Sequence, residues 1–227
     1  MFRRASRTLL LLVALLMLAN RANADIAFTT GAMAEIFAPV SFLEGDTESS
    51  TVIAILDEGI SVLPGDVFVN AFGVGIHDFT APPYLLVPAG TRVQSYLVHF
   101  DPVGASFATL TGGVFFDPGE TIIGVQTHTP LLYTTDGPLG DPMATYPDVF
   151  IEFRAFETLP GTDTVTLPPD MGSASFTLFA ELGVDEARIL TFAVPEPSSL
   201  ALACLAALGV SRLARRTPSR RRIAAFR

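Results

Sequence analysis

Short runs of β-branched and aromatic residues, separated by proline and glycine, dominate the middle of this chain. Such side chains favour extended strands, whereas Pro and Gly supply the backbone angles of tight turns. The runs predict strands at residues 34–39, 51–56, 66–72, 92–100, 113–116, 121–125, 149–157, 163–167, 173–182 and 187–193. Turns are expected between them, at 63–66, 81–83, 117–120, 136–138, 159–162 and 168–172. No segment repeats apolar residues at helical spacing over several turns, so long amphipathic helices are not expected. We therefore predict an all-β domain, an antiparallel β-sandwich of the jelly-roll type.

Charge divides the 227 residues into a middle and two ends. All 14 basic residues are arginines, and all 23 acidic residues lie between positions 25 and 197. This segment holds only three arginines, which leaves it with a net charge of −20. Nucleic acid and anionic lipid require a basic surface, so neither is an expected partner of the domain.

The three internal arginines are Arg92, Arg154 and Arg188. Because acids surround them, each is expected to form a structural ion pair, and Asp185 and Glu186 are close to Arg188 in sequence. A ligand-binding arginine is the alternative. Arg154 falls on the mixed face of the strand predicted at 149–157, which suggests a partly covered outer surface.

The first 24 residues have the order of a secretory signal peptide. Three arginines precede an apolar run at 9–19, and small residues follow, ending in Ala22-Asn23-Ala24. The run is too short to span a hydrocarbon core of about 30 Å at about 1.5 Å per residue. We expect export through the general secretion translocon and cleavage by signal peptidase before Asp25.

Residues 194–227 contain three distinct parts. Pro195-Glu196-Pro197 comes first, and its two prolines disfavour both helix and central strand. An uncharged segment at 198–211 follows, long enough for about 21 Å of helix, and is predicted to be a short transmembrane helix. Behind it lies an arginine-rich tail that begins with Arg212, Arg215 and Arg216. These arginines are expected to stay cytoplasmic as an anchor, leaving the Pro-Glu-Pro motif outside.

This arrangement resembles the PEP-CTERM sorting signal of exported bacterial proteins. The resemblance implies that an exosortase-type transpeptidase recognises the motif, removes the tail and transfers the protein to an envelope or extracellular acceptor. Residues 94–104, 123–125 and 134–140 also resemble a recurrent domain of PEP-CTERM proteins that has no assigned activity.

The same C-terminal segment also resembles the C-terminal segment of ice-binding proteins. Thr162, Thr164 and Thr166 alternate along one predicted strand. An ice-binding plane needs a repeated array of such threonine rows, and the sequence shows a single row. The ordinary β-propensity of threonine explains it.

Few residues point to catalysis. The three histidines lack metal-binding spacing, although His99 and Asp101 have the spacing of an acid–base or metal pair on one strand. No Gly-x-Ser-x-Gly motif occurs, and Cys204 is the only cysteine, which excludes an intramolecular disulfide. We expect no catalytic residues and no enzymatic activity, with a secreted glycosidase-type activity left open.

Calcium is the one ion that the composition suggests. Two acid-rich turns offer oxygen ligands, and neither matches the EF-hand pattern. The candidate ligands are Asp136, Asp141, Asp163 and Asp170.

The sequence thus predicts three regions: a signal peptide at 1–24, an acidic β-sandwich domain at 25–193 and a sorting signal at 194–227. The expected protein passes through the inner membrane and reaches the outer cell surface or the extracellular matrix, where the domain has a structural or adhesive, non-enzymatic role. The alternative is a secreted carbohydrate-binding or carbohydrate-active module, with exopolysaccharide as partner. The absence of tryptophan disfavours a sugar-stacking platform, although four tyrosines are available: Tyr84, Tyr96, Tyr133 and Tyr146.

Overall fold

The computed structural model describes residues 26–78, 84–104, 107–147, 154–156, 162–180 and 184–193. The chain divides into two units, one formed by residues 24–194 and the other by the two ends. The predicted signal peptide, sorting motif, apolar segment and arginine tail lie outside the described residues. In the part of the chain that is described, no helix combines the length and the apolar character needed to cross a membrane.

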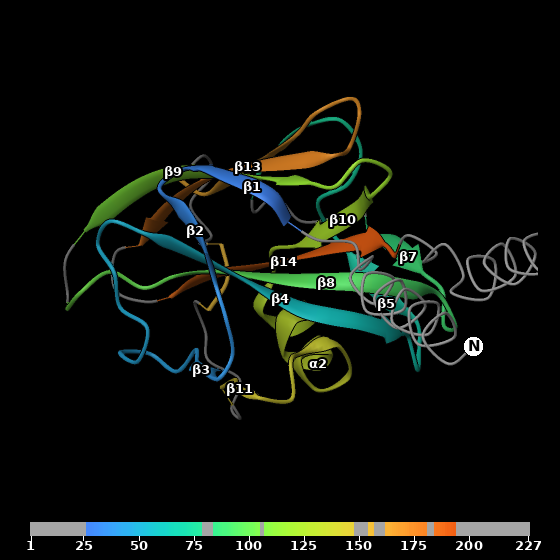
Figure 1. The fold of residues 1–227 in the computed structure, drawn as a ribbon, viewed down its shortest axis with the longest axis horizontal. Coiled ribbons are helices and arrows are strands. Elements are labelled where there is room, and N and C mark those ends of the chain that lie inside the picture. Colours follow the sequence, from blue (N-terminus) through green and yellow to red (C-terminus); the bar gives the residue numbers. More distant parts are fainter. Residues whose placement is uncertain are drawn as a thin grey trace, which may run out of the picture. The chain divides into compact units, whose positions relative to one another are not determined.

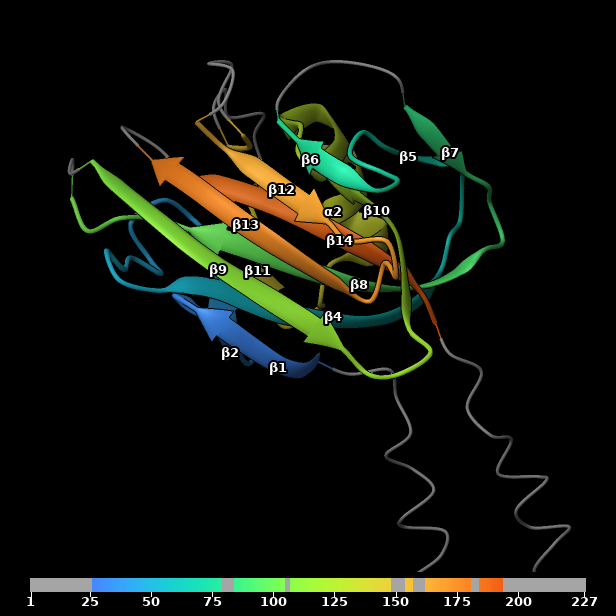
Figure 2. The same cartoon turned by 90° about the horizontal axis from the view of Figure 1, so that it is seen from above.

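Two five-stranded sheets form the domain (Figures 1 and 2). Sheet A has the order β1-β9-β13-β12-β6. Its strands are β1 (Ile26–Gly31), β6 (Gly75–His77), β9 (Ala108–Phe116), β12 (Thr164–Leu167) and β13 (Ser173–Ala180). Sheet B has the order β10-β14-β8-β4-β2. Its strands are β2 (Met33–Ile36), β4 (Ile53–Val62), β8 (Arg92–Phe100), β10 (Thr121–Gln126) and β14 (Asp185–Phe192).

The two sheets share one apolar core. Alternate residues of the strands point into it, for example Val114 and Phe176 from sheet A and Val98 and Ile189 from sheet B. This alternation is the period-two pattern that half-buried strands require. The predicted all-β class is confirmed, and both sheets are open rather than closed.

The prediction that the strands pair antiparallel is wrong for some pairs. β2 pairs with β4 in parallel, with Met33 opposite Ile53. The short strands β3 (Val40–Ser41) and β11 (Ala144–Thr145) also pair in parallel. Parallel neighbours need a long connection between them, and here the chain between β2 and β4 contains β3.

The second face of sheet B is covered as well. Helix α2 (Thr129–Leu139) lies against it in Figure 1, and the two-stranded sheet of β5 (Val67–Val69) and β7 (Leu85–Val87) packs on the same face. Leu132 of α2 belongs to an apolar cluster that also includes Leu56 and Leu97 of sheet B. Because sheet B is covered on both sides, β8 and β14 are buried along almost their whole length.

Helix α2 corrects the turn predicted at 136–138. Pro130 stands at the helix start, where its fixed φ is favourable and its missing N–H is not needed. Leu132, Thr135 and Leu139 form the buried face at helical spacing. Gly137 and Pro138, which suggested a turn, lie in the last helical turn. The helix was missed because Gly137 and Pro138 usually indicate a turn, and because the packing that stabilises the helix comes from sheet B.

The predicted strand at 149–157 is described only at residues 154–156, where Ala155 forms a single bridge with Glu186. Arg154 is 2% exposed, which corrects its predicted place on a partly covered outer surface.

Candidate functional site

Charged side chains gather on the face of sheet B that α2 covers. We call this group the buried ion cluster; its members are Glu58, Asp136, Arg154, Glu186 and Arg188.

Arg188 lies at the centre of the cluster and is completely buried. Its Nε and Nη2 atoms each donate to one carboxylate oxygen of Glu58 at 2.8 Å, a bidentate pair. Nη2 also donates to Asp136 at 2.9 Å, and Nη1 donates to the Thr135 hydroxyl at 2.7 Å. Both carboxylate partners are distant in sequence: Glu58 is on β4 and Asp136 is on α2.

Arg154 forms the second half of the cluster. Its Nε donates to Glu186, and its Nη1 and Nη2 donate to the two oxygens of Asp136. Glu186 also pairs with Nδ1 of His99 at 2.9 Å. Asp136 therefore bridges the two arginines.

The electrostatics favour the charged form of both arginines. Burial by itself lowers the pKa of Arg188, but Glu58 and Asp136 outweigh it and hold that pKa above its ordinary value. Burial likewise opposes the charge of Arg154, and Glu186 and Asp136 raise its pKa overall. The cluster thus keeps its two positive charges at every accessible pH.

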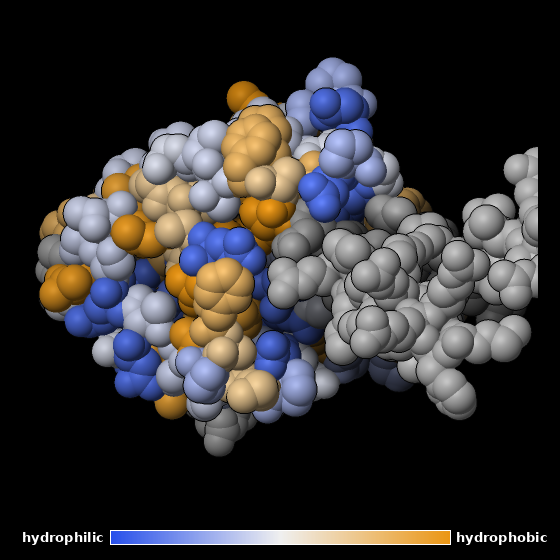
Figure 3. Space-filling model, in the orientation of Figure 1, coloured by the Kyte–Doolittle hydropathy of each residue, from blue (hydrophilic) through white to orange (hydrophobic). Residues whose placement is uncertain are grey.

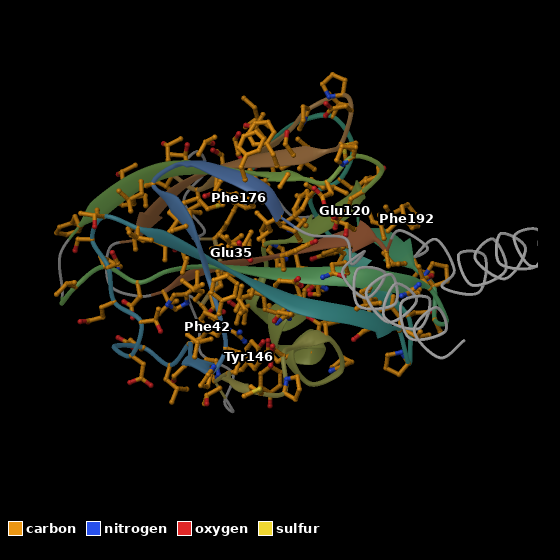
Figure 4. The ribbon with its side chains drawn as sticks, viewed as in Figure 1. Glu35, Phe42, Glu120, Tyr146, Phe176 and Phe192 are labelled. Atoms are coloured by element: carbon orange, nitrogen blue, oxygen red, sulfur yellow. The ribbon has the colours of Figure 1, made fainter. Side chains whose placement is uncertain are left out.

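Tyr146 and Thr135 extend the cluster through hydroxyl groups. The Tyr146 hydroxyl donates to Glu58 at 2.7 Å, while the Thr135 hydroxyl donates to Gln126 at 2.8 Å. Burial, followed by the charge of Glu58, raises the pKa of Tyr146. Figure 4 shows Tyr146 and Phe42 on the α2 side of sheet B, and Phe176 in the layer between the sheets.

Glu120 is a separate buried carboxyl group. It accepts hydrogen bonds from the hydroxyls of Tyr96 at 2.7 Å and Thr191 at 2.5 Å. Burial raises its pKa above the ordinary 4.5, and these hydrogen bonds offset only part of that effect.

The geometry of the buried ion cluster indicates a structural role. Its charges come from β4, β14, α2 and the segment at 154–156, so the ion pairs hold these elements together. The charged groups face one another and not solvent, which leaves little surface for a ligand.

The three predicted ion-pair arginines have different surroundings. Arg154 and Arg188 pair with carboxylates, and the partners of Arg188 are Glu58 and Asp136 and not its sequence neighbours Asp185 and Glu186. Arg92 begins β8 and is exposed, and no ion pair to it is found among the described residues.

The four calcium candidates do not come together. Asp136 is occupied by the two arginines. The other three accept backbone N–H groups: Asp141 from Met143, Asp163 from Phe179 and Asp170 from Gly172. Within the described ranges, no group of three or more His, Cys, Asp or Glu residues has the arrangement of a metal site. His99 and Asp101 also have different partners, because Asp101 accepts the N–H of Gly45 at 2.8 Å.

Sequence reasoning missed Glu58 as a member of the cluster and Tyr146 as its hydrogen-bond partner, and it named Glu186 as a neighbour of Arg188, whereas Glu186 pairs with Arg154. One signal was present, since Glu186 and Arg188 lie two residues apart in β14, on either side of Ala187 and next to the apolar pair Ile189 and Leu190. This spacing puts both charges on one face of a strand that is buried on both sides.

The class of the protein is defined by its C-terminal region. The family model of the PEP-CTERM protein-sorting motif matches residues 193–221. The chain therefore carries a PEP-CTERM protein-sorting motif, which supports an exported protein. No curated protein and no solved structure matches it.

Proposed function

We propose that this protein is an exosortase-processed component of the bacterial cell surface or extracellular matrix, and that its β domain has a non-enzymatic structural or adhesive role. The match at residues 193–221 is the observation that carries the proposal. The described part of the chain adds an acidic β domain with a packed apolar core.

That domain is held by its core and its ion pairs. The only cysteine, Cys204, lies beyond the domain, so no disulfide joins its strands. Two apolar layers flank sheet B, and the buried ion cluster links α2 to that sheet. Packing and buried ion pairs thus hold the described part of the domain together, which suits a structural or adhesive component.

In this proposal the basic ends serve only for transport. Signal peptidase cuts before Asp25, and the C-terminal apolar segment then holds the protein in the inner membrane for a time. The arginines after residue 211 stay cytoplasmic, which presents Pro195-Glu196-Pro197 to the exosortase on the outer side. Cleavage near this motif releases the domain to its acceptor.

Mass spectrometry of the exported protein from its native host tests this proposal. We expect an N-terminus at Asp25 and loss of the arginine tail, and Glu196→Ala should leave the tail in place and the protein in the membrane fraction. Glu44→Ala, which changes an exposed glutamate of the domain, is the matched control and should be processed normally. An exported wild-type protein that still contains residues 220–227 would contradict the proposal.

A further inference from the structure

The outer face of sheet A is uncharged, although the domain around it is strongly acidic. Outward positions on its five strands carry threonine, serine, phenylalanine, glycine and isoleucine, and none of those described carries a charge. Figure 2 looks onto this face, and no described element crosses it. The side of the molecule seen in Figure 3, by contrast, has strongly hydrophilic residues among apolar ones. We call the outer face of sheet A the hydroxyl face.

Hydroxyl groups form rows across the strands. Thr111 of β9 lies opposite Thr177 of β13, and their hydroxyl oxygens are 3.3 Å apart. Thr164 of β12 lies opposite Thr177 on its other side and continues the row.

A second row runs parallel to the first. Thr30, Ser175 and Thr166 come from three different strands, and Gly113 lies between the first two. A Cβ at Gly113 would lie 3.0 Å from the Thr30 hydroxyl and 3.3 Å from the Ser175 hydroxyl, so the glycine leaves room for both. Thr164 and Thr166, two of the three threonines predicted to alternate along one strand, therefore belong to an array over four strands, while Thr162 precedes β12.

Aromatic pairs flank the two rows on either side along the strand direction. Phe28 and Phe115 stack with ring centroids 4.3 Å apart, and they are 54% and 36% exposed. Near the opposite end of β9, Phe107 stacks on Phe179, which lies opposite Thr109. Thr109 and Phe115 are separated by about 20 Å along the strand. The face thus offers two aromatic surfaces with hydroxyl rows between them.

This chemistry fits a neutral, hydroxyl-rich polymer. Phenylalanine rings pack against the C–H surface of sugar rings, and threonine and serine hydroxyls both donate and accept hydrogen bonds. A polyanion would be repelled by a domain of charge −20, and a polycation would find no carboxylate on the face itself. The separation of the aromatic pairs calls for a chain of sugars and not for a single one.

We propose that the hydroxyl face binds a neutral polysaccharide lying along β9 and β13. This inference rests on the proposed extracellular role and names the partner of the domain. Tyr96 is buried between the sheets, so the binding aromatics are the exposed phenylalanines and not that tyrosine. The twist of the sheet and the projecting rings distinguish this face from the flat plane that ice requires.

Binding by the purified full chain to amylose, dextran and cellulose tests the inference, with the polyanion alginate for comparison. We expect wild-type protein to bind at least one neutral glucan and not alginate. We expect the double variant Phe28→Ser/Phe115→Ser and the single variant Thr177→Glu each to bind about tenfold more weakly than wild type. Phe37→Ser, at a phenylalanine outside the face, and Thr145→Glu, at an exposed threonine of β11, are matched controls that should bind as wild type does.

Several results would overturn the inference. One is that wild-type protein binds no neutral glucan, and another is that the face variants bind as tightly as wild type. A third is that wild type forms a dimer in gel filtration and the face variants do not. Thermal hysteresis in ice that is lost with Thr177→Glu would assign the face to ice instead. Thermal unfolding of the face variants is the folding control. Midpoints within a few degrees of wild type establish that a variant that no longer binds is still folded. Correct C-terminal processing combined with absent glucan binding would refute this inference alone and leave the proposed function intact.

Discussion

Arg188 is a fully buried cation in a protein with very few internal basic residues, and its charge is balanced by Glu58 and Asp136. Removing one partner of a buried ion pair leaves the other charge without compensation. At the level of single residues, the cluster is therefore the most sensitive part of the domain.

Arg188→Met should lower the free energy of unfolding by about 3–5 kcal/mol, because Glu58 would remain buried with its bidentate partner gone. Adding Glu58→Met should recover a large part of the loss, since the second change removes the uncompensated charge. Urea denaturation followed by circular dichroism measures both effects. Arg92→Met, at an exposed arginine, is the control and should change stability by no more than about 0.5 kcal/mol. A similar loss in Arg188→Met and Arg92→Met would contradict the assigned role.

Glu120 makes stability depend on pH. Its pKa is raised in the folded state, so its contribution to stability is fully present below the unfolded pKa and is lost as pH rises through the folded pKa. Glu120→Gln removes this titration. We therefore expect the unfolding free energy of wild type, relative to the variant, to fall as pH rises from about 4 and then to level off. Urea unfolding at a series of pH values checks this, and a constant difference would show that Glu120 does not titrate in this way.

At the level of elements, the end of α2 and the segment that follows it in the chain, which carries Tyr146, make a close contact at Gly140. A Cβ at this position would lie 2.4 Å from the carbonyl oxygen of Asp136 and 2.6 Å from Cε2 of Tyr146. The absence of a side chain lets the Tyr146 ring approach the helix end and reach Glu58.

Gly140→Ala should therefore destabilise the protein by about 1–3 kcal/mol. Gly137→Ala, in the same helix, should change the stability by less than about 0.5 kcal/mol, because a Cβ there meets nothing within 4 Å outside its chain neighbours, while the ring of Pro138 opposes the gain in helix propensity. Thermal unfolding of the two variants gives the comparison. A loss of stability in Gly137→Ala as large as that in Gly140→Ala would argue against the close contact at Gly140.

At the level of the whole molecule, the acidic surface opposes the folded state. The negative charges of the domain repel one another, and salt screens this repulsion as the Debye length falls from about 30 Å at 0.01 M to about 8 Å at 0.15 M. The buried ion cluster is screened much less than the surface.

The melting temperature should accordingly rise when NaCl increases from about 10 mM to about 150 mM. Calorimetry of the purified protein measures it, and CaCl₂ at equal ionic strength is the comparison. Equal rises of the melting temperature in NaCl and CaCl₂ indicate that the salts only screen the repulsion between the acidic groups. A clearly larger shift with CaCl₂, reversed by EDTA, would support the calcium site that the acidic turns suggested.

Local sequence signals predicted many of the strands. The run at 92–100 matches β8 in full, and those at 121–125 and 173–182 match β10 and β13 closely, because β-branched and aromatic residues favour strands wherever they occur. Helix α2 was not predicted, since Gly137 and Pro138 are turn residues and the packing that stabilises the helix comes from sheet B. The candidate site was predicted in part: two arginines could be named, but not their partners, as Glu58 is 130 residues from Arg188.

The sequence by itself determined the β-rich class, the segregation of charge and the sorting signal, because each depends on residue types at short spacing. Only the tertiary structure decided which distant residues meet. It brought Glu58, Asp136 and Arg188 together under α2, and it assembled threonines from separate strands into one uncharged face. The physical reason is that strand order and register join segments far apart in the chain, and the local pattern of one strand carries no information about its neighbour.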